Sequence, residues 1–367
     1  MREPVNRRTR STVVQRHDDP HWLNTNKPLC TVLSLFLSYS FCSVLLAADP
    51  TPAYSSTSAG ESAVCALASG KASRSLLLDI THAGKRLVAV GDRGHIVYSD
   101  DQGKTWTQAK VPTRQLLTAV YFVDETHGWA VGHDAQILAS SDGGETWVKQ
   151  FEDLKREAPL LDLWFKDLST GIAVGAYGAL LQTTDGGLHW NDIGERLNNE
   201  DQYHLNGIAS VKDAGLFIVG EMGSMFRSAD DGQTWEKLEG PYQGSLFGAI
   251  GTSQANTLLA YGLRGNLFRS TDFGRHWEQI PLQGERGPLE FSIANASLLP
   301  DSSIVLVGNG GSLMRSTDDG ETFIVSSRPD RLSLAGVAQN GKGNLILVGQ
   351  GGVHVTSLTG ADVAQQQ

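Results

Sequence analysis

The segment SSDGGETW, residues 140–147, decides the fold because its pattern occurs six times along the chain. Every copy has Ser or Thr first, Asp third, Gly fifth and an aromatic residue eighth. The copies are SDDQGKTW (99–106), SSDGGETW (140–147), TTDGGLHW (183–190), SADDGQTW (228–235), STDFGRHW (270–277) and STDDGETF (316–323). Their aspartates follow one another at intervals of 41 to 46 residues: Asp101, Asp142, Asp185, Asp230, Asp272 and Asp318. A period of this length indicates one structural unit per copy.

Each unit predicts four short strands. A glycine stands ten residues before each aspartate, at Gly91, Gly132, Gly175, Gly220, Gly262 and Gly308. In the first unit the strands correspond to LLLDITHAG, RLVAVGD, HIVYSDD and TWTQAKV, with alternating apolar residues and Gly or Asp at the turns. A seventh unit, LILVGQGGVHVTS (345–357), repeats the glycine-centred half without the Asp motif. The sequence therefore predicts an all-β, seven-bladed β-propeller of four-stranded antiparallel blades over residues 74–357.

Closure of the ring is predicted to involve the segment before the first blade. The seventh unit offers only three strands, and an incomplete blade would leave an open sheet edge. The apolar stretch SAVCALAS (62–69), within an N-terminal segment 49–73, is the expected fourth strand. Cys65 would then be buried and unreactive. Residues 358–367 are predicted to be a disordered tail.

Residues 1–48 have the pattern of a secretory signal. Basic residues precede an uncharged, Leu- and Phe-rich stretch from Pro28 to Ala48, which ends on the small residues Ala47 and Ala48. Export to the periplasm or an equivalent lumen is expected; the alternative is an uncleaved N-terminal anchor, since the stretch nearly matches the thickness of a bilayer.

The net charge restricts the possible partners, and the cysteine content restricts disulfide formation. Beyond residue 48 the chain has 24 Lys and Arg against 37 Asp and Glu, a net charge of −13. Such a surface repels nucleic acid and anionic lipid. Only Cys65 remains of the three cysteines, so no disulfide can form within that part.

The Asp motif suggests catalysis, but its chemistry is that of a hairpin. A short Asp side chain accepts hydrogen bonds from backbone N–H groups of its own turn, and the Gly two residues later tolerates positive φ. The aromatic residue offers an apolar face for packing between blades, at Trp106, Trp147, Trp190, Trp235 and Trp277. Calcium binding and a pair of glycosidase carboxylates are the alternatives, but six equivalent rim positions provide neither converging ligands nor a pair across a cleft.

These repeats resemble the Asp-boxes, or BNR repeats, of sialidases, sortilin-type receptors and other propellers. The fuller pattern in AVGDRGHIVYSDDQGKTW (89–106) and IVGEMGSMFRSADDGQTW (218–235) resembles the photosystem II stability/assembly factor family. The resemblance covers residues 74–357. It implies a non-catalytic scaffold that docks a membrane-protein segment on an arginine patch.

Six arginines fall at one end of the predicted ring. They precede inner strands or follow second strands: Arg74, Arg93, Arg114, Arg156, Arg264 and Arg331. The planar guanidinium group suits a carboxylate, including a chain terminus, so these residues are the predicted binding site for a protein partner. The alternative is an ordinary surface neutralised by neighbouring acids. Arg227, Arg269 and Arg315 recur before the Asp motif and are expected to pair with acids at the periphery.

Two functions are compatible with this sequence. The first is an exported, monomeric scaffold that binds a protein of a membrane complex and needs no cofactor or metal. The alternative is a glycan-active propeller, either a sialidase-like hydrolase or a lectin, in which Arg74, Arg114 and Arg331 would hold a sugar carboxylate. The long link 193–207, with Tyr203 and His204, is either a partner-binding loop or ordinary packing. His127, His133 and His354 lack metal-ligand spacing.

Overall fold

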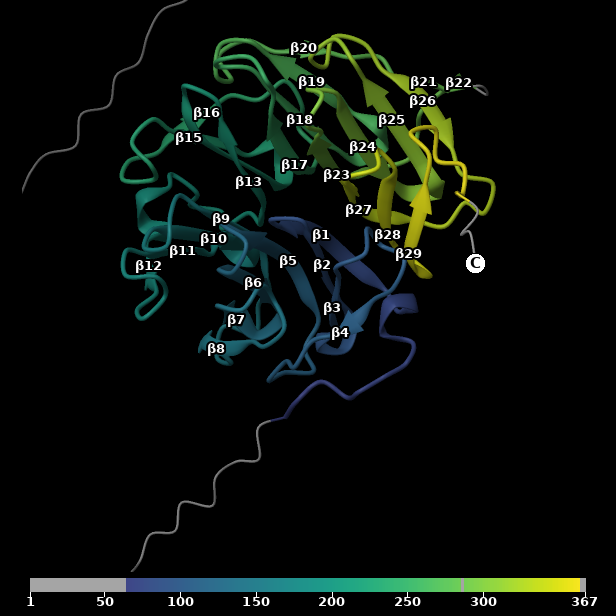
Figure 1. Cartoon of the computed structure of the whole chain (residues 1–367). Coiled ribbons are helices and arrows are strands. Elements are labelled where there is room, and N and C mark those ends of the chain that lie inside the picture. Colours follow the sequence, from purple (N-terminus) through teal and green to yellow (C-terminus); the bar gives the residue numbers. More distant parts are fainter. Residues whose placement is uncertain (1–63, 285–286, 364–367) are drawn as a thin grey trace, which may run out of the picture. The chain divides into compact units, whose positions relative to one another are not determined.

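The computed structural model describes residues 64–284 and 287–363 and shows a ring of seven antiparallel sheets (Figure 1). Blade 1 contains β1 (Leu77–Ala83), β2 (Arg86–Gly91), β3 (Ile96–Ser99) and β4 (Thr107–Gln108). Blade 2 contains β5 (Leu117–Phe122), β6 (Gly128–Gly132), β7 (Ile137–Ser140) and β8 (Val148–Phe151). Blade 3 contains β9 (Leu160–Phe165), β10 (Gly171–Gly175), β11 (Leu180–Thr183) and β12 (Asn191–Asp192). The predicted fold class is confirmed.

The remaining blades repeat this order. Blade 4 contains β13 (Leu205–Val211), β14 (Gly215–Gly220), β15 (Met225–Ser228) and β16 (Glu236–Leu238), and blade 5 contains β17 (Leu246–Gly251), β18 (Leu258–Gly262), β19 (Leu267–Ser270) and β20 (Glu278–Gln279). Blade 6 contains β23 (Ile293–Leu298), β24 (Ile304–Gly308), β25 (Ser312–Ser316) and β26 (Ile324–Ser327). Blade 7 contains β27 (Leu334–Gln339), β28 (Leu345–Gly349) and β29 (Gly352–Thr356). A two-stranded hairpin, β21 (Gln283–Gly284) and β22 (Gly287–Pro288), links blades 5 and 6.

Short 3-10 turns complete the described elements. Six of them follow the second strand of a blade: η2 (Asp92–Gly94), η3 (His133–Ala135), η4 (Ala176–Gly178), η6 (Glu221–Gly223), η7 (Leu263–Gly265) and η8 (Asn309–Gly311). The other two, η1 (Ala72–Arg74) and η5 (Gly194–Arg196), lie in links between elements. No helix within the described ranges is long and apolar enough to cross a membrane.

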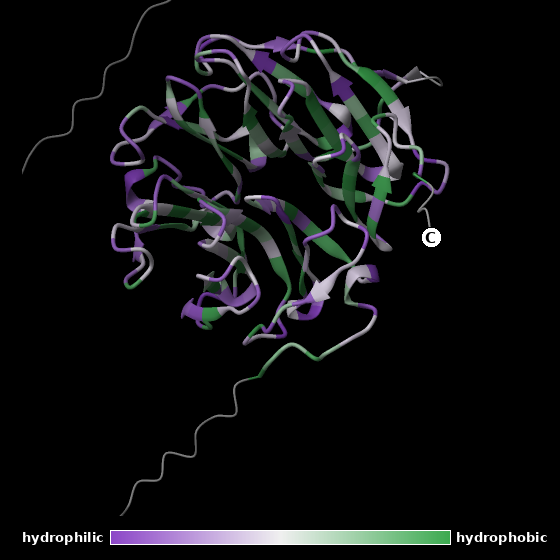
Figure 2. Ribbon diagram, in the orientation of Figure 1, coloured by the Kyte–Doolittle hydropathy of each residue, from purple (hydrophilic) through white to green (hydrophobic). Residues whose placement is uncertain are grey.

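Apolar packing between neighbouring blades forms the core. Hydrophobic residues are concentrated in the strands and hydrophilic residues in the peripheral turns (Figure 2). The buried side chains form seven clusters, and each joins two consecutive blades. The aromatic residue of each Asp-box packs against the cluster shared with the preceding blade, as Trp147 does with Val88 and Val90 of blade 1. The predicted role of the Asp-box aromatics between blades is therefore confirmed.

Each Asp-box forms the predicted hydrogen-bonded turn. In the second box the Ser140 hydroxyl donates to Asp142, and the Gly144 N–H donates to the Ser140 oxygen. The backbone N–H and the hydroxyl of Thr146 both donate to the Asp142 carboxylate. These hydrogen bonds hold the pKa of Asp142 below its usual range despite partial burial.

The three repeated arginines lie beside these turns and pair with acids, as predicted. Arg227 pairs with Glu236 at 2.7 Å, and Arg315 pairs with Asp301 at 3.5 Å. Arg269 lies 3.6 Å from Asp319 of the next blade and also donates to its carbonyl. They therefore support the Asp-box end of the ring.

The repeated glycines mark a close approach of two backbones. In every blade the pairing of the inner strand with the second strand is irregular near its start, as between Leu77 and Asp79. A Cβ on the glycine that ends the second strand would lie 2.1–2.4 Å from the carbonyl oxygen that precedes the inner strand. The φ of Gly132 is −176°, which any residue adopts. Lack of space, rather than backbone conformation, therefore requires glycine here.

The ring closes differently from the prediction. Residues 64–69 form no strand, and blade 7 has three strands rather than four. The described part of the predicted closing strand lies along blade 1 instead, where Ala66 N–H donates to Val111 O at 2.9 Å. Cys65 is exposed, so the expectation of a buried thiol is wrong. Val64 and Leu67, the largest apolar side chains of this segment, are 58% and 63% exposed, so neither is buried against a blade.

Closure comes instead from packing and from the C-terminal segment. Inner strands β1 and β27 contact each other, and one apolar cluster joins Leu87 and Val97 of blade 1 to Ile346 and Val348 of blade 7. Residues 358–363, expected to begin a disordered tail, fold back on β29 through a bridge between Thr356 and Asp362. Leu358 packs against the cluster between blades 6 and 7, where an Asp-box aromatic is missing.

Candidate protein-binding face

The turns that follow the second strands gather at one end of the ring. Each of η2, η3, η4, η6, η7 and η8 contacts the inner strand of the next blade at its start. The links between blades therefore reach the same end, and the Asp-boxes occupy the other. This arrangement agrees with the end on which the six arginines were predicted to lie.

Four of the six predicted arginines lie on consecutive blades at this end. Arg331 precedes blade 7, Arg74 precedes blade 1, Arg93 lies in the turn of blade 1, and Arg114 precedes blade 2. All four are exposed. We refer to Arg331, Arg74, Arg93 and Arg114 as the arginine arc.

Close backbone contacts between turns and links position this arc. A Cβ on Gly94 would lie 3.2 Å from the Cα of Arg114, so Arg93 and Arg114 adjoin. A Cβ on Gly352 would lie 2.5 Å from the Cα of Arg74. The bulged propeller geometry thus brings arginines from separate units to one surface.

Most of the guanidinium groups in the arc remain free of acid partners. Within residues 64–284 and 287–363, only Arg93 has an ion pair, with its neighbour Asp92 at 3.4 Å. Arg114 donates through Nε to the carbonyl of Cys65 at 2.9 Å, which leaves its charge uncompensated. Asp330, which lies next to Arg331 in the sequence, pairs instead with Arg328 at 2.6 Å.

The other two predicted arginines stand apart from the arc. Arg156 is half-buried and pairs with Asp192 and Asp153. Arg264 is exposed in the turn of blade 5, away from blades 7, 1 and 2. The predicted set of six therefore divides into an arc of four, one paired arginine and one separate arginine.

Sequence reasoning missed Arg328, which is 2% exposed. Its guanidinium contacts the Asp330 carboxylate, the Asp362 carboxylate at 2.8 Å and the carbonyl of Gly360 at 3.1 Å. It therefore fixes the C-terminal segment against the link before blade 7. No local pattern distinguishes it from the exposed Arg331 three residues later.

Two half-buried carboxylates join inner strands of neighbouring blades. Asp79 accepts the Val120 N–H of blade 2 at 2.9 Å, and Asp162 accepts the Ile208 N–H of blade 4 at 2.9 Å. Asn295 of blade 6 lies 3.5 Å from Asp79. Both acids occupy the same position, two residues after the buried Leu that begins the strand. That recurrence, in the apolar stretches LLLDI and LLDLW, was the available sequence signal.

Burial raises the pKa of both carboxyl groups to about 7. The mutual repulsion with Asp162 contributes to the shift of Asp79, and backbone hydrogen bonds oppose it. Burial also raises the pKa of the Tyr261 hydroxyl, which lies near both charges. The innermost strands therefore carry two acids that titrate near neutral pH.

We expect Asp79 and Asp162 to contribute stability that is lost as pH rises from about 4 to about 7. Asp79 and Asp162 have a pKa of about 7 in the folded protein against 3.8 unfolded, so the folded state binds their protons more tightly and loses this advantage on deprotonation. Thermal unfolding midpoints between pH 4 and pH 8 test this. The Asp79→Asn/Asp162→Asn variant should show a weaker pH dependence, whatever its absolute stability. An unchanged slope in the variant would contradict the assignment, since His82 and His95, whose pKa values burial lowers, act with the opposite sign in both proteins.

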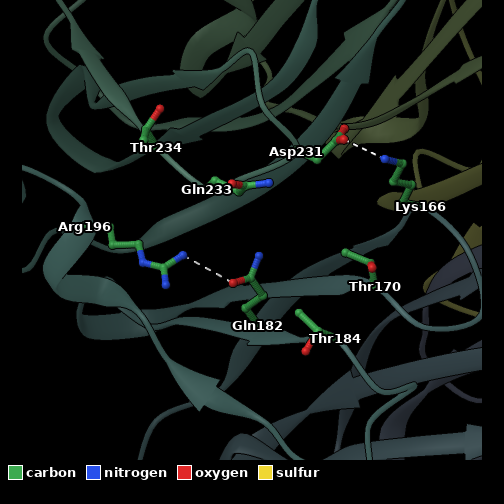
Figure 3. Close-up of a pocket in the computed structure, with 8 residues that line it drawn as sticks. All are labelled: Lys166, Thr170, Gln182, Thr184, Arg196, Asp231, Gln233 and Thr234. Carbon is green, nitrogen blue, oxygen red and sulfur yellow. Dashed lines mark hydrogen bonds and ion pairs between the residues drawn. The ribbon is translucent and has the colours of Figure 1, made fainter.

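A polar cleft between blades 3 and 4 is one competing site. Its volume is about 580 Å³, and all eight lining residues are polar or charged (Figure 3). Lys166 pairs with Asp231 at 2.7 Å, and Arg196 donates to Gln182 at 3.3 Å. The lining includes no aromatic side chain on which a sugar ring could stack, and none of Arg74, Arg114 and Arg331. The cleft therefore gives no specific support to a glycan site.

Tyr203 and His204, the candidates in the long link 193–207, contact neighbouring parts of the protein. The ring of His204 packs against Tyr177 with centroids 4.9 Å apart, and Asn199 hydrogen-bonds both the N–H and the carbonyl of Tyr203. The long link 193–207 is thus packed against the turn of blade 3. In the described part of the chain, no three His, Cys, Asp or Glu side chains are grouped as metal ligands.

Comparisons with known proteins identify the family and agree with the fold. The family model described as photosynthesis system II assembly factor YCF48 matches residues 98–158 and 150–287, more than half of the chain. The chain belongs to this family. A YCF48-family relative, the photosystem II assembly protein Ycf48 of Synechococcus sp. (strain JA-2-3B'a(2-13)), is 37% identical over 133 residues, which are 35% of this chain and 39% of the relative.

Other YCF48-family relatives match shorter segments. The chloroplastic photosystem II stability/assembly factor HCF136 of Cyanidioschyzon merolae is 37% identical over 95 residues, 24% of this chain and 22% of the relative. The chain therefore matches well under half the length of these two curated relatives.

Solved structures establish the likeness of fold. A structure of YCF48 bound to D1 peptide superposes with a TM-score of 0.63 at 19% identity, covering 78% of this chain and 94% of the other. A streptogramin B lyase, at 13% identity, reaches 0.65 over 77% of this chain and 93% of the other. At these identities both comparisons establish the propeller fold alone.

Proposed function

We propose that this chain is an exported, non-catalytic scaffold that binds a carboxylate-bearing segment of a membrane protein on its arginine arc. Through that contact it would help to assemble or stabilise a membrane complex. The observation that carries the proposal is the arc itself. Four exposed arginines from three consecutive blades lie at one end of a chain with a net charge of −10.

The chemistry of the arc suits a peptide carboxylate. A guanidinium group offers parallel N–H donors that match the two oxygens of a side-chain or terminal carboxylate. Side chains on adjacent turns could engage several such groups along one segment. The D1 peptide bound to a member of the same family supports a protein segment as the ligand of this chain.

The site of action follows from the leader. Basic residues and an apolar stretch within residues 1–48 support export to the periplasm or an equivalent lumen. That segment lies outside the described residues. A scaffold in this compartment could reach a membrane-protein segment without crossing a bilayer itself.

Charge reversal of the arc should remove the partner. We expect tagged wild-type protein to co-purify a membrane protein from gently solubilised host membranes, and Arg74→Glu/Arg114→Glu/Arg331→Glu to lose it. Added salt should weaken the wild-type contact because exposed charges are screened. Mass spectrometry of each eluate provides the measurement.

A matched variant controls for net charge. Lys104→Glu/Lys237→Glu/Arg275→Glu changes the charge equally at exposed positions outside the arc and should retain the partner. Equal recovery by the arc variant would remove the arginine arc from the proposal. Absence of any membrane protein from the wild-type eluate would contradict the scaffold function.

A further inference from the structure

The turns at the arginine end share an unusual backbone conformation. The middle residue of six of these turns has φ between 51° and 66°, the left-handed region in which glycine is least strained. Only blade 6 places glycine there. The six residues are Arg93, Asp134, Tyr177, Met222, Arg264 and Gly310.

Two of these strained positions carry large apolar side chains that face solvent. Tyr177 is 61% exposed and Met222 is 55% exposed. Neither side chain is buried in the core, so packing of the blades does not explain the choice of an aromatic and a thioether residue. Both side chains are therefore free to contact a partner at this end of the ring.

His204 links the two positions into one surface. Its ring packs edge-on against Tyr177 with centroids 4.9 Å apart. Its backbone N–H donates to the Glu221 carboxylate at 3.1 Å, and its carbonyl accepts the Glu221 N–H at 3.0 Å. Glu221 immediately precedes Met222. We call Tyr177, His204 and Met222 the apolar shelf.

The shelf and the arginine arc lie at the same end of the ring on different blades. The arc spans blades 7, 1 and 2, whereas the shelf spans blades 3 and 4. A ligand that contacts both must carry charge in one part and apolar groups in another. Aromatic and Met side chains are enriched at protein interfaces because they bury a large area and adapt their shape.

We propose that the apolar shelf is a second contact for the peptide that binds the arginine arc. The partner segment carries one or more carboxylates and, at a separate position, large apolar side chains that cover Tyr177 and Met222. This inference rests on the proposed function and adds a specificity that charge alone does not provide.

A peptide library separates the two contacts. The probe is a set of synthetic 12-residue peptides with free carboxyl ends, in which each position is Ser, Asp, Leu or Phe. Immobilised protein is incubated with the set, and retained peptides are identified by mass spectrometry. The wild type should enrich peptides with acidic residues and, independently, peptides with Leu or Phe.

The expected effects differ between variants. Tyr177→Asn/Met222→Asn keeps a residue that tolerates positive φ and should lower Leu and Phe enrichment roughly tenfold while acidic enrichment persists. Leu188→Asn removes an apolar side chain that is 78% exposed in the Asp-box of blade 3, and should change neither preference. The triple arginine reversal should abolish acidic enrichment.

The outcomes distinguish the two proposals. Leu and Phe enrichment that is absent from the wild type, or unchanged in Tyr177→Asn/Met222→Asn, overturns the apolar shelf. Acidic enrichment that is absent, or insensitive to the arginine reversal, contradicts the arginine arc. Enrichment of Leu and Phe tests only the apolar shelf, and enrichment of acidic residues tests only the arginine arc. One proposal can therefore fail while the other stands.

Discussion

Replacement of Gly132 by Ala should destabilise the propeller by several kcal/mol, enough to reduce the yield of folded protein sharply. The new Cβ would lie 2.2 Å from the Leu116 carbonyl oxygen and 2.9 Å from the Cα of Leu117. Both are backbone atoms, one just before and one at the start of inner strand β5, so a side-chain rotation cannot relieve the clash. Overpacking of this kind costs about 1–3 kcal/mol in side-chain cores and more where backbone must move.

Chemical denaturation of the purified variants measures this effect. Gly70→Ala is the matched control, because no atom lies within 4 Å of its added Cβ. It should unfold at the wild-type denaturant concentration. If Gly132→Ala were as stable as the wild type, the close approach of the second strand to the inner strand would not require glycine. Lack of space would then not explain the seven repeated glycines.

Replacement of Phe165 by Ala should cost about 3–5 kcal/mol of unfolding free energy. Phe165 is 1% exposed and stacks on Trp129 with ring centroids 3.6 Å apart. Its other neighbour is the Asp-box residue Trp190, whose ring meets it edge-on at 5.8 Å. Removal of the ring leaves a cavity between blades 2 and 3. This loss is a large fraction of the 5–15 kcal/mol that typically separates folded from unfolded protein.

Urea denaturation followed by tryptophan fluorescence tests this prediction. Leu188→Ala removes a side chain that is 78% exposed and should shift stability by less than about 0.5 kcal/mol. A loss below about 1 kcal/mol in Phe165→Ala would indicate that the aromatic stack adds little to the contact between these blades.

Most of the fold could be predicted from the sequence because of the repeat. Glycine and Asp motifs at fixed separations specify turns, and turns at fixed separations specify blades. The Asp-box contacts were predictable because Ser140, Asp142 and Thr146 are close in sequence and satisfy one another locally.

Closure was not predictable because it depends on contacts between distant residues. Leu87 of blade 1 packs in one cluster with Ile346 of blade 7, and no local pattern encodes that contact. Segment 64–69 and residues 358–363 are both short. Their positions depend on hydrogen bonds to distant residues, such as Ala66 N–H to Val111 O and Arg328 to Gly360 O, and on Leu358, which only the assembled blades reveal.

The candidate site was predicted only in part. Blade register placed the arginines at the end of the ring that carries the turns after the second strands, but it could not show that Asp192 of the outermost strand of blade 3 pairs with Arg156. Tyr177 and Met222 were overlooked because an apolar residue in a repeat is ordinarily part of the core. Only the structure shows that both residues lie in left-handed turns at the surface, where their side chains are exposed.

The most direct test of the arginine arc as a docking face is site-specific photo-cross-linking in host membranes. A photoreactive residue at Leu76, beside Arg74, or at Gln115, beside Arg114, should cross-link to a membrane protein. The same residue at Lys104 or Leu188, in the Asp-boxes of blades 1 and 3, should not. Cross-links that arise only from the Asp-box positions, or equally from both ends of the ring, would contradict the account.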